Sequence, residues 1–309
     1  MARLIAVTGA TGNQGGSVAK LLLQSPNEYR VRALTRNPDS EAAKELAKLG
    51  AEIVKADLTI ASDIAPALRG CWGVFAVTNF YDPKILDDPV SEERQGKDLA
   101  KAALEENVQC FVWSSLPSSS KLSDGKLISR IYEGKHHVDN YIREIGLPAT
   151  FVFTGNFYEN WVFRGHVHYD KEKDVVEFRQ PIVLPQSKLA MLYVEKDLSA
   201  IAKAIFDNWE SKREQLHHAY LYACNARLSP TEITSAIEKI SGKRAIYTVL
   251  PSSGVPDRDT MFELYNSVGM YPGKEIPDEN VLKLGVKLHS VENFIRDRLL
   301  PHLGLQPKT

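Results

Sequence analysis

Short apolar runs alternate with helical patterns through the first half of the chain. The apolar runs, rich in β-branched residues, predict six strands, at 4–8, 30–35, 52–56, 73–77, 110–114 and 150–154. Apolar positions that recur with helical spacing predict helices between these strands, at 15–23, 40–49, 90–106 and 126–145. Strands that alternate with helices are typical of parallel sheets with crossover helices. The pattern therefore predicts an α/β fold with a doubly wound parallel sheet.

The second half of the chain loses this regular alternation. Strand-like segments at 181–193, 219–223 and 244–250 mix with helical segments, which lie at 196–208, 230–240 and 291–299. We therefore predict a first domain at residues 1–155 and a smaller α+β lobe at residues 156–309. We expect the lobe to cover the carboxyl edge of the sheet, with some late segments free to return to it.

Composition narrows the class of protein. The chain has 309 residues, and 38 Lys and Arg against 39 Asp and Glu give a net charge of -1. No basic excess exists for direct nucleic-acid binding. The three cysteines have no metal-ligand spacing, and the paired histidines lack a third ligand, so we expect neither a disulfide framework nor a metal. The chain starts directly with a strand and has no apolar run of about 20 residues, which predicts a cytoplasmic protein without a membrane span and leaves a nuclear location open.

A glycine-rich turn connects the first predicted strand to the first helix. Three glycines, Gly9, Gly12 and Gly15, repeat at intervals of three. In this position, glycines let a pyrophosphate approach backbone N–H groups at the positive end of a helix. The turn therefore predicts a dinucleotide site that includes Gly9, Thr11, Gly12, Asn13, Gln14 and Gly15.

The end of the second strand indicates which dinucleotide is preferred. An NAD site usually has a carboxylate there that binds the ribose 2′-hydroxyl. This chain instead has Arg36 and no acid, and a guanidinium matches the charge and geometry of a 2′-phosphate. We therefore predict NADP(H), with Asn13 or Lys126 as the determinant if Arg36 is only a surface residue. Asp57 follows the third strand as an adenine contact, and Thr78 and Asn79 follow the fourth at the cofactor's ribose.

These residues together resemble the NmrA-like family of atypical short-chain dehydrogenases/reductases. The resemblance rests on VTGATGNQGGSVAKLLL (7–23), VRALTRNP (31–38), AEIVKADL (51–58), VFAVTNF (74–80), QGKDLAKAA (95–103), FVWSSL (111–116), YEGKHHVDNYIREIGLPATFV (132–152) and GNFYENW (155–161). It covers the first 160 residues well and implies a Rossmann-like fold that binds NADP(H). The family includes redox-sensing transcriptional regulators as well as NADPH-dependent reductases, so it leaves catalysis open.

The expected catalytic helix has a changed motif. Short-chain reductases use a tyrosine with a lysine four residues later, whereas Tyr132 and Lys135 are three apart and cannot superpose on that pair. The resemblance assigns Lys135 to the nicotinamide ribose and, in catalytic relatives, to proton transfer. Tyr132 is a second proton-donor candidate or a packing residue. Ser114 and Ser115, at the end of the fifth strand, are candidates for polarising the substrate or for capping the strand.

The loop after the sixth strand contains Asn156, Phe157, Tyr158 and Asn160. We place Asn156 and Phe157 at the nicotinamide face, and Phe157 and Tyr158 either in an apolar substrate pocket or between the lobes. The leading hypothesis is an NADPH-dependent reductase of a small apolar carbonyl, imine or conjugated substrate. The alternatives are a non-catalytic NADPH/NADP⁺ sensor that docks onto a regulatory protein, and a nucleotide-sugar epimerase. A homodimer is left open.

Overall fold

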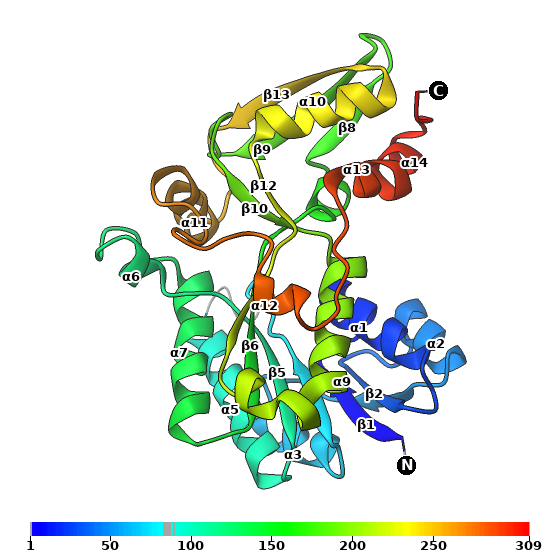
Figure 1. Cartoon of the computed structure of the whole chain (residues 1–309), viewed down its shortest axis with the longest axis vertical. Coiled ribbons are helices and arrows are strands. Elements are labelled where there is room, and N and C mark those ends of the chain that lie inside the picture. The colour runs from blue at the N-terminus through cyan, green and yellow to red at the C-terminus, as the bar shows by residue number, and fades with distance from the viewer. Residues whose placement is uncertain (1, 83–87, 89, 309) are drawn as a thin grey trace.

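Seven parallel strands form the main sheet of the protein. The computed structural model describes residues 2–82, 88 and 90–308. The strand order is β11-β6-β5-β4-β1-β2-β3, so the direction of winding reverses between β1 and β4 (Figure 1). These strands are β1 (Arg3–Val7), β2 (Tyr29–Thr35), β3 (Glu52–Lys55), β4 (Gly73–Ala76), β5 (Cys110–Ser115), β6 (Ala149–Thr154) and β11 (Tyr220–Ala223). The predicted doubly wound sheet is confirmed, and ligands of such sheets bind where the winding reverses.

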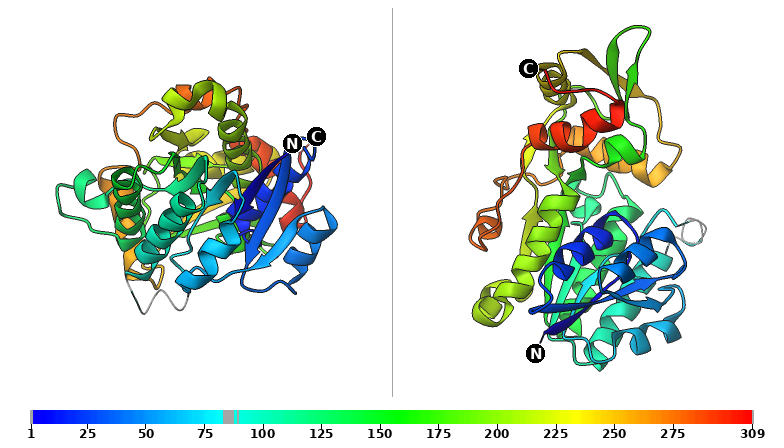
Figure 2. Two further views of the ribbon diagram at one scale, coloured as in Figure 1. Left: turned by 90° about the horizontal axis from the view of Figure 1, so that it is seen from below. Right: turned by 90° about the vertical axis from the view of Figure 1, so that its right-hand side faces the viewer.

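Helices cover both faces of this sheet, because the central strands are apolar on both sides. One face packs against α1 (Asn13–Leu23), α2 (Glu41–Lys48) and α9 (Ser199–Leu216). The other face packs against α3 (Ala61–Leu68), α5 (Ser91–Glu105) and α7 (Arg130–Glu144). The right-hand view of Figure 2 looks onto the face that α1 and α9 cover.

Two small sheets build the lobe beyond the carboxyl edge of the main sheet. One has the order β12-β10-β7 and the other β13-β9-β8. Their strands are β7 (Asn156–Phe157), β8 (Val167–Asp170), β9 (Val175–Pro181), β10 (Leu189–Leu192), β12 (Ala226–Leu228) and β13 (Arg244–Leu250). Figure 1 shows the lobe above the ends of the parallel strands.

Among the described residues, the remaining helices are short except for two in the lobe. These two are α10 (Pro230–Ser241) and α11 (Pro256–Ser267). A capping box between Ser229 and Glu232 starts α10, and Gly242, at φ 68°, ends it. The short elements are α6 (Ser119–Leu122), α8 (Asn160–Phe163), α12 (Glu279–Leu282), α13 (Val291–Phe294), α14 (Leu300–Leu303) and the π-helical turns η1 (Val194–Leu198) and η2 (Ile295–Leu299).

Three predicted elements differ from the structure. The strand expected at 181–193 is wrong, because β9 and β10 belong to different sheets and a loop separates them. The helix expected from residue 126 begins only at Arg130, because Ser123 Oγ binds the backbone of Leu127 and closes a turn there. The helix expected to end at 208 continues to Leu216. Residues 199–223 therefore return to the main sheet as α9 and β11.

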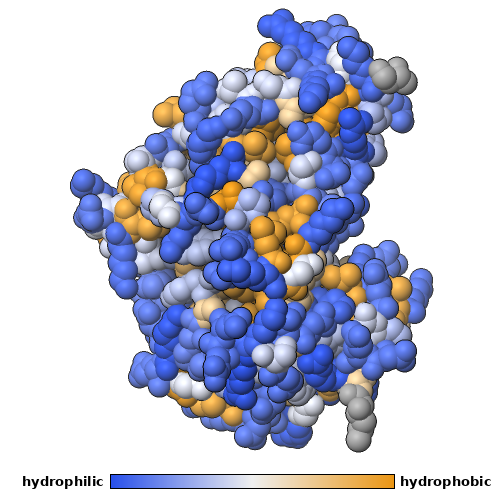
Figure 3. Space-filling model, in the orientation of Figure 1, coloured by the Kyte–Doolittle hydropathy of each residue, from blue (hydrophilic) through white to orange (hydrophobic). Residues whose placement is uncertain are grey.

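The outer surface on the face of Figure 1 is mostly polar. Figure 3 shows apolar side chains that gather where the lobe meets the sheet domain, beside a hollow in the outline. Among the described residues, no helix is both long and apolar enough to span a membrane.

Candidate active site

A cavity of about 720 Å³ lies at the carboxyl edge of the main sheet and extends under the lobe. Loops after six parallel strands, together with α7, α8 and α11, supply its walls. It collects most of the residues predicted from the sequence, namely Gly9, Thr11, Gly12, Asn13, Gln14, Gly15, Arg36, Asp57, Thr78, Asn79, Ser114, Lys135, Asn156 and Phe157. Tyr132, Ser115 and Tyr158 are not among its lining residues.

The glycine-rich turn forms one end of the cavity, which we call the glycine-loop end (residues 9–15). Gly9 has φ +56°, a left-handed conformation that glycine adopts without strain. A Cβ at Gly15 would lie 2.3 Å from the backbone oxygen of Thr8, so only glycine lets α1 start this close to β1. The first N–H groups of α1, which have no partner within the helix, therefore remain available to an anion.

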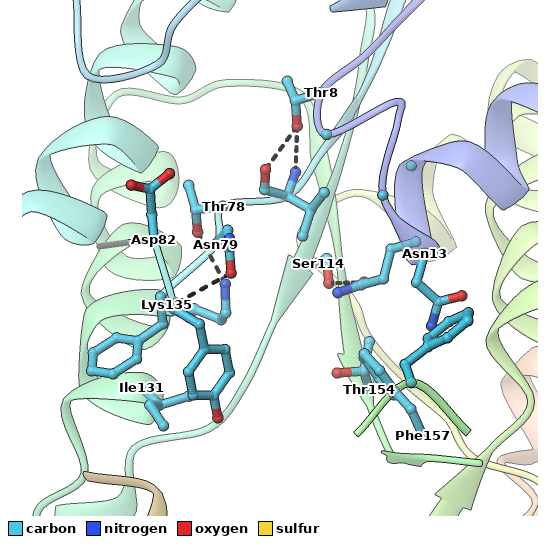
Figure 4. Close-up of a pocket in the computed structure, with 18 of the residues that line it drawn as sticks. Thr8, Asn13, Thr78, Asn79, Asp82, Ser114, Ile131, Lys135, Thr154 and Phe157 are labelled. Carbon is cyan, nitrogen blue, oxygen red and sulfur yellow. Dashed lines mark hydrogen bonds between the residues drawn. The ribbon is translucent and has the colours of Figure 1, made fainter. Parts of the chain in front are cut away.

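Thr8 holds this turn against the loop that follows β4. Its Oγ1 donates to the Val77 carbonyl at 2.9 Å and accepts from the Val77 N–H at 2.8 Å (Figure 4). Thr78 and Asn79 come directly after this contact, and both line the cavity. The two loops that enclose the switch point are thus fixed to each other through one buried hydroxyl.

Arg36, at the end of β2, forms an ion pair with Asp82 from the loop after β4. The Asp82 side chain is 7% exposed and the Arg36 side chain 52% exposed, so the pair lies at the cavity rim. The Asp82 carboxylate therefore pairs with the same Arg36 guanidinium that we predict to bind the 2′-phosphate. Asp57 also lies at the rim, where its Oδ1 accepts from the N–H of Thr59 at 3.0 Å and from its hydroxyl at 2.8 Å.

Lys135 takes part in a buried polar cluster in the middle of the cavity wall. Its Nζ donates to Glu92 Oε1 at 2.9 Å and to Thr78 Oγ1 at 3.0 Å, and the Thr78 hydroxyl donates to the same Glu92 oxygen at 2.7 Å. The Lys135 and Glu92 side chains are 10% and 3% exposed. Lys135 points from α7 toward Thr78 in Figure 4. Glu92, in the first turn of α5, was not predicted, because it lies 43 residues from Lys135 in the sequence.

The two serines at the end of β5 point to opposite sides, as neighbouring residues of a strand do. Ser114 Oγ donates to Gln14 Oε1 at 2.7 Å inside the cavity (Figure 4). Ser115 Oγ donates instead to Asp139 Oδ1 at 2.5 Å, under α7. Burial raises the pKa of the Asp139 carboxyl to about 8 against the effect of this hydrogen bond. Only Ser114 therefore has access to a bound ligand.

Tyr132 lies about 60° around α7 from Lys135 and does not line the cavity. It is fully buried, and its hydroxyl forms a hydrogen bond of 3.1 Å with Tyr265 Oη of α11. Burial raises its pKa well above the ordinary tyrosine value. The side chain packs the lobe against α7, which favours the packing alternative for Tyr132. Tyr158 is likewise buried, and its hydroxyl lies 3.0 Å from Asn225 Oδ1.

The lobe supplies the far wall of the cavity, which sequence reasoning left largely undescribed. We call Arg164, His166 and Arg258, together with Tyr81, whose ring both arginines approach, the lobe end. Apolar side chains also line the cavity, from the lobe (Phe163, Met261, Phe262 and Met270) and from the sheet domain (Leu116 and Ile131). These residues come from segments about 100 positions apart, and no local motif joins them.

Metal and disulfide chemistry have no support among the residues that the structure describes. No group of three His, Cys, Asp or Glu side chains there is placed to hold an ion. Cys71, Cys110 and Cys224 are buried free thiols, and burial raises the pKa of each. They are therefore packing residues in this structure.

Comparisons with known proteins agree with this architecture. Residues 1–292 match the NmrA-like family. The NmrA-like family domain-containing oxidoreductase hkm9 of Aspergillus hancockii is 32% identical over 297 residues, which cover 90% of this chain and 87% of that protein.

Two solved structures have the same fold. The negative transcriptional regulator NmrA in complex with NADP has a TM-score of 0.76 and 21% identity, and the match covers 96% of this chain and 95% of that one. NmrA has also been solved in complex with NAD. A Citrobacter sp. triphenylmethane reductase complexed with NADP(H) has a TM-score of 0.69 and 16% identity, with 95% and 99% covered.

Proposed function

The chain belongs to the NmrA-like family, and we propose that it is an NADPH-dependent reductase of small carbonyl, imine or conjugated compounds. One observation carries the proposal: a single cavity joins the glycine-loop end to apolar side chains of the lobe and of α7. The part of the cavity under the lobe could hold a substrate beside the dinucleotide. Ligand pockets of this kind are largely apolar with a few placed polar groups.

The residues at the glycine-loop end fit a dinucleotide. Because Gly15 has no Cβ, the start of α1 can lie against the backbone of Thr8 at the end of β1. A phosphate-binding turn requires this close approach. Asn13 and Gln14 lie in the first turn of α1, and Arg36 provides a positive charge at the rim for the 2′-phosphate. NADPH, when bound, would supply the hydride for the reduction.

Lys135 is the proposed source of the proton. Its ammonium faces the cavity wall, and its two hydrogen bonds, to Glu92 and Thr78, leave one of its three N–H donors for a ligand. A substrate oxygen or nitrogen that gains charge during reduction would be stabilised by this donor and would then take its proton. Ser114 also lines the cavity, and its hydroxyl would orient the acceptor group if it turned from Gln14 to the substrate.

The relative that is 32% identical over most of both chains carries the name oxidoreductase, which supports this proposal.

A specific observation favours the sensor alternative: the Tyr132 hydroxyl is held by Tyr265 and does not line the cavity. Lys135 is also already paired with Glu92. A sensor would bind NADP⁺ and NADPH with different affinities and would not oxidise NADPH with any acceptor.

Absorbance at 340 nm tests the proposal directly. The purified protein is mixed with NADPH and a panel of aldehydes, quinones, cyclic imines and conjugated enals, and Lys135→Met is compared with Lys101→Met, whose exposed lysine lies on α5. We expect Lys135→Met to lower kcat about a hundredfold at unchanged NADPH affinity, and Lys101→Met to change neither. No oxidation across the panel, together with unequal binding of NADP⁺ and NADPH, would favour the sensor.

A further inference from the structure

Three basic side chains meet at the lobe end of the cavity. The guanidinium carbon of Arg164 lies 4.5 Å from the centre of the Tyr81 ring, and that of Arg258 lies 5.3 Å from it. His166, two residues after Arg164, lines the same wall. Burial and the two arginines lower the pKa of the His166 imidazole to about 4, so it is neutral at pH 7.

Neither arginine forms an ion pair with a carboxylate within the described part of the chain. Arg164 Nε donates to the Asn160 side chain at 3.3 Å, and Arg258 Nη2 donates to the Ser253 carbonyl at 3.0 Å. The Nε of Arg258 is buried and has no hydrogen-bond partner among the described residues.

The nearby acids have other partners. Asp257 Oδ2 accepts hydrogen bonds from Arg130 Nε at 2.8 Å and from Arg130 Nη2 at 2.5 Å. Asp82 forms an ion pair with Arg36. Asp259 accepts from the Ser253 N–H at 2.7 Å and from the Ser252 hydroxyl at 2.5 Å.

Two guanidinium groups that share one ring repel each other. Burial lowers the pKa of Arg164, and the repulsion from Arg258 lowers it further. Two like charges without a described carboxylate in ion-pair contact are unfavourable, and a buried donor without a hydrogen-bond partner adds to the cost. An anion in the cavity that both arginines contact would lower both costs and would form charge-assisted hydrogen bonds.

We propose that Arg164, Arg258 and His166 bind an anionic group of the substrate, so that the reductase acts on carbonyl or imine compounds that carry a carboxylate. This inference rests on the proposed function. The apolar wall of Ile131, Met261 and Phe262 would contact the body of such a compound, and the arginines would fix its charged end away from Lys135. A carboxylate matches the bidentate geometry of a guanidinium. The cofactor's own phosphates are the other source of this chemistry, and the experiment separates the two.

Binding is measured first, independently of turnover. Protein saturated with NADP⁺ is titrated calorimetrically with 2-naphthoate and with the neutral 2-naphthamide. We expect naphthoate to bind at least about tenfold more tightly, and Arg164→Gln and Arg258→Gln each to remove about tenfold of its affinity while naphthamide changes less than about twofold. The control is Arg179→Gln, a lobe arginine on β9 that pairs with Glu177 outside the cavity.

Equal binding of the two probes to the wild-type protein would overturn the proposal. A second result would also overturn it: the arginine variants weaken the binding of NADPH to the free protein and leave the binding of NADH unchanged. The arginines would then bind the 2′-phosphate of the cofactor. Turnover is measured separately with 4-carboxybenzaldehyde and methyl 4-formylbenzoate, and we expect the wild type to prefer the free acid. If naphthoate binds as expected but neither aldehyde oxidises NADPH, the anion site stands and the reductase proposal fails.

Discussion

The two ends of the cavity are built in different ways. The glycine-loop end consists of backbone from a single turn, and its shape depends on how closely α1 approaches β1 at Gly15. The lobe end consists of side chains from α11 and from the segment around α8. Both segments bring an arginine to the ring of Tyr81, which comes from the loop after β4. The difference indicates that the cofactor end is fixed locally, whereas the substrate end can be changed one side chain at a time.

The largest effect is expected from a substitution at the glycine-loop end. Gly15→Val would place side-chain atoms against the Thr8 and Gly9 carbonyl groups, from which even a Cβ would lie only 2.3 and 2.5 Å. We expect NADPH binding to fall below detection, because the start of α1 must move away from β1. Fluorescence titration with NADPH measures this loss.

Gly134→Ala is the matched control, because its Cβ would have its nearest neighbour at 3.8 Å, in the Glu92 side chain. It should bind NADPH normally. Circular dichroism checks that the Gly15 variant is folded. Normal NADPH binding by a folded Gly15→Val protein would show that the cradle does not depend on this close approach.

The buried ion pair between the two ends is expected to have the next largest effect. Lys135→Met leaves the Glu92 carboxylate buried without its cation, which typically costs about 3–5 kcal/mol of unfolding free energy. The double variant Lys135→Met/Glu92→Leu should recover most of this loss, since an apolar pair replaces an ionic one of similar size. Urea denaturation measures both.

Lys97→Met provides the comparison at the surface. Lys97 pairs with Glu93 on the same helix, α5, with side chains 38% and 24% exposed. Its loss should cost less than about 1 kcal/mol. If the double variant were as unstable as Lys135→Met alone, the loss would come from packing around Lys135 and not from the unpaired carboxylate.

The sequence predicts the two ends unequally for the same physical reason. The glycine turn could be located because β1, the turn and α1 are consecutive, and the spacing of Gly9, Gly12 and Gly15 reports a local backbone requirement. The sheet could be predicted because each parallel strand is a short apolar run between helices. Arg164 and Arg258 could not be paired, since they are brought to the same ring only when α11 packs against α7.

Two pairs of candidate residues, one on β5 and one on α7, show why the sequence alone could not decide which residue of each pair faces the cavity. Ser114 and Ser115 are adjacent, and the alternation of strand side chains implies that only one of them faces the cavity. Tyr132 and Lys135 differ by about 60° around α7. The sequence does not say which side of this helix the lobe covers, and in the structure Tyr265 takes the hydroxyl of Tyr132.

The stability of the protein should depend on pH in opposite directions through Asp139, beneath α7, and His166, at the lobe end. Burial raises the pKa of Asp139, beneath α7, to about 8, so the folded state holds a proton there that the unfolded state releases above pH 4. Its contribution to stability is therefore lost as the pH rises from 4 to 8. Burial lowers the pKa of His166 at the lobe end to about 4, so its contribution is lost as the pH falls from 6.5 to 4.

Single substitutions separate these two slopes. Relative to the wild type, Asp139→Asn should gain on the order of 3 kcal/mol between pH 4.5 and pH 8, because the folded protein no longer has to keep a carboxyl protonated. His166→Gln should gain on the order of 1–2 kcal/mol between pH 6.5 and pH 4.5. Chemical denaturation at four pH values measures both. Parallel pH curves for a variant and the wild type would mean that the group titrates alike in the folded and unfolded states.

The smallest expected effect concerns the ion pair at the rim of the glycine-loop end. Arg36→Asp should shift the preference from NADPH toward NADH by about ten- to a hundredfold, because a carboxylate repels the 2′-phosphate and accepts the free hydroxyl. Asp82→Asn tests the same site from the other side. It removes the carboxylate that pairs with Arg36, so we expect NADPH to bind about two- to fivefold more tightly and NADH binding to stay unchanged.

The comparison of the two cofactors makes this last effect specific. A general change in the loop after β4 would alter NADPH and NADH binding together, because both share the pyrophosphate cradle at residues 9–15. A change confined to NADPH requires that the guanidinium of Arg36 meets the 2′-phosphate, for which the Asp82 carboxylate competes. If Asp82→Asn weakens NADPH binding instead, Asp82 serves to hold Arg36 in position for the phosphate, and the ion pair is an orienting contact.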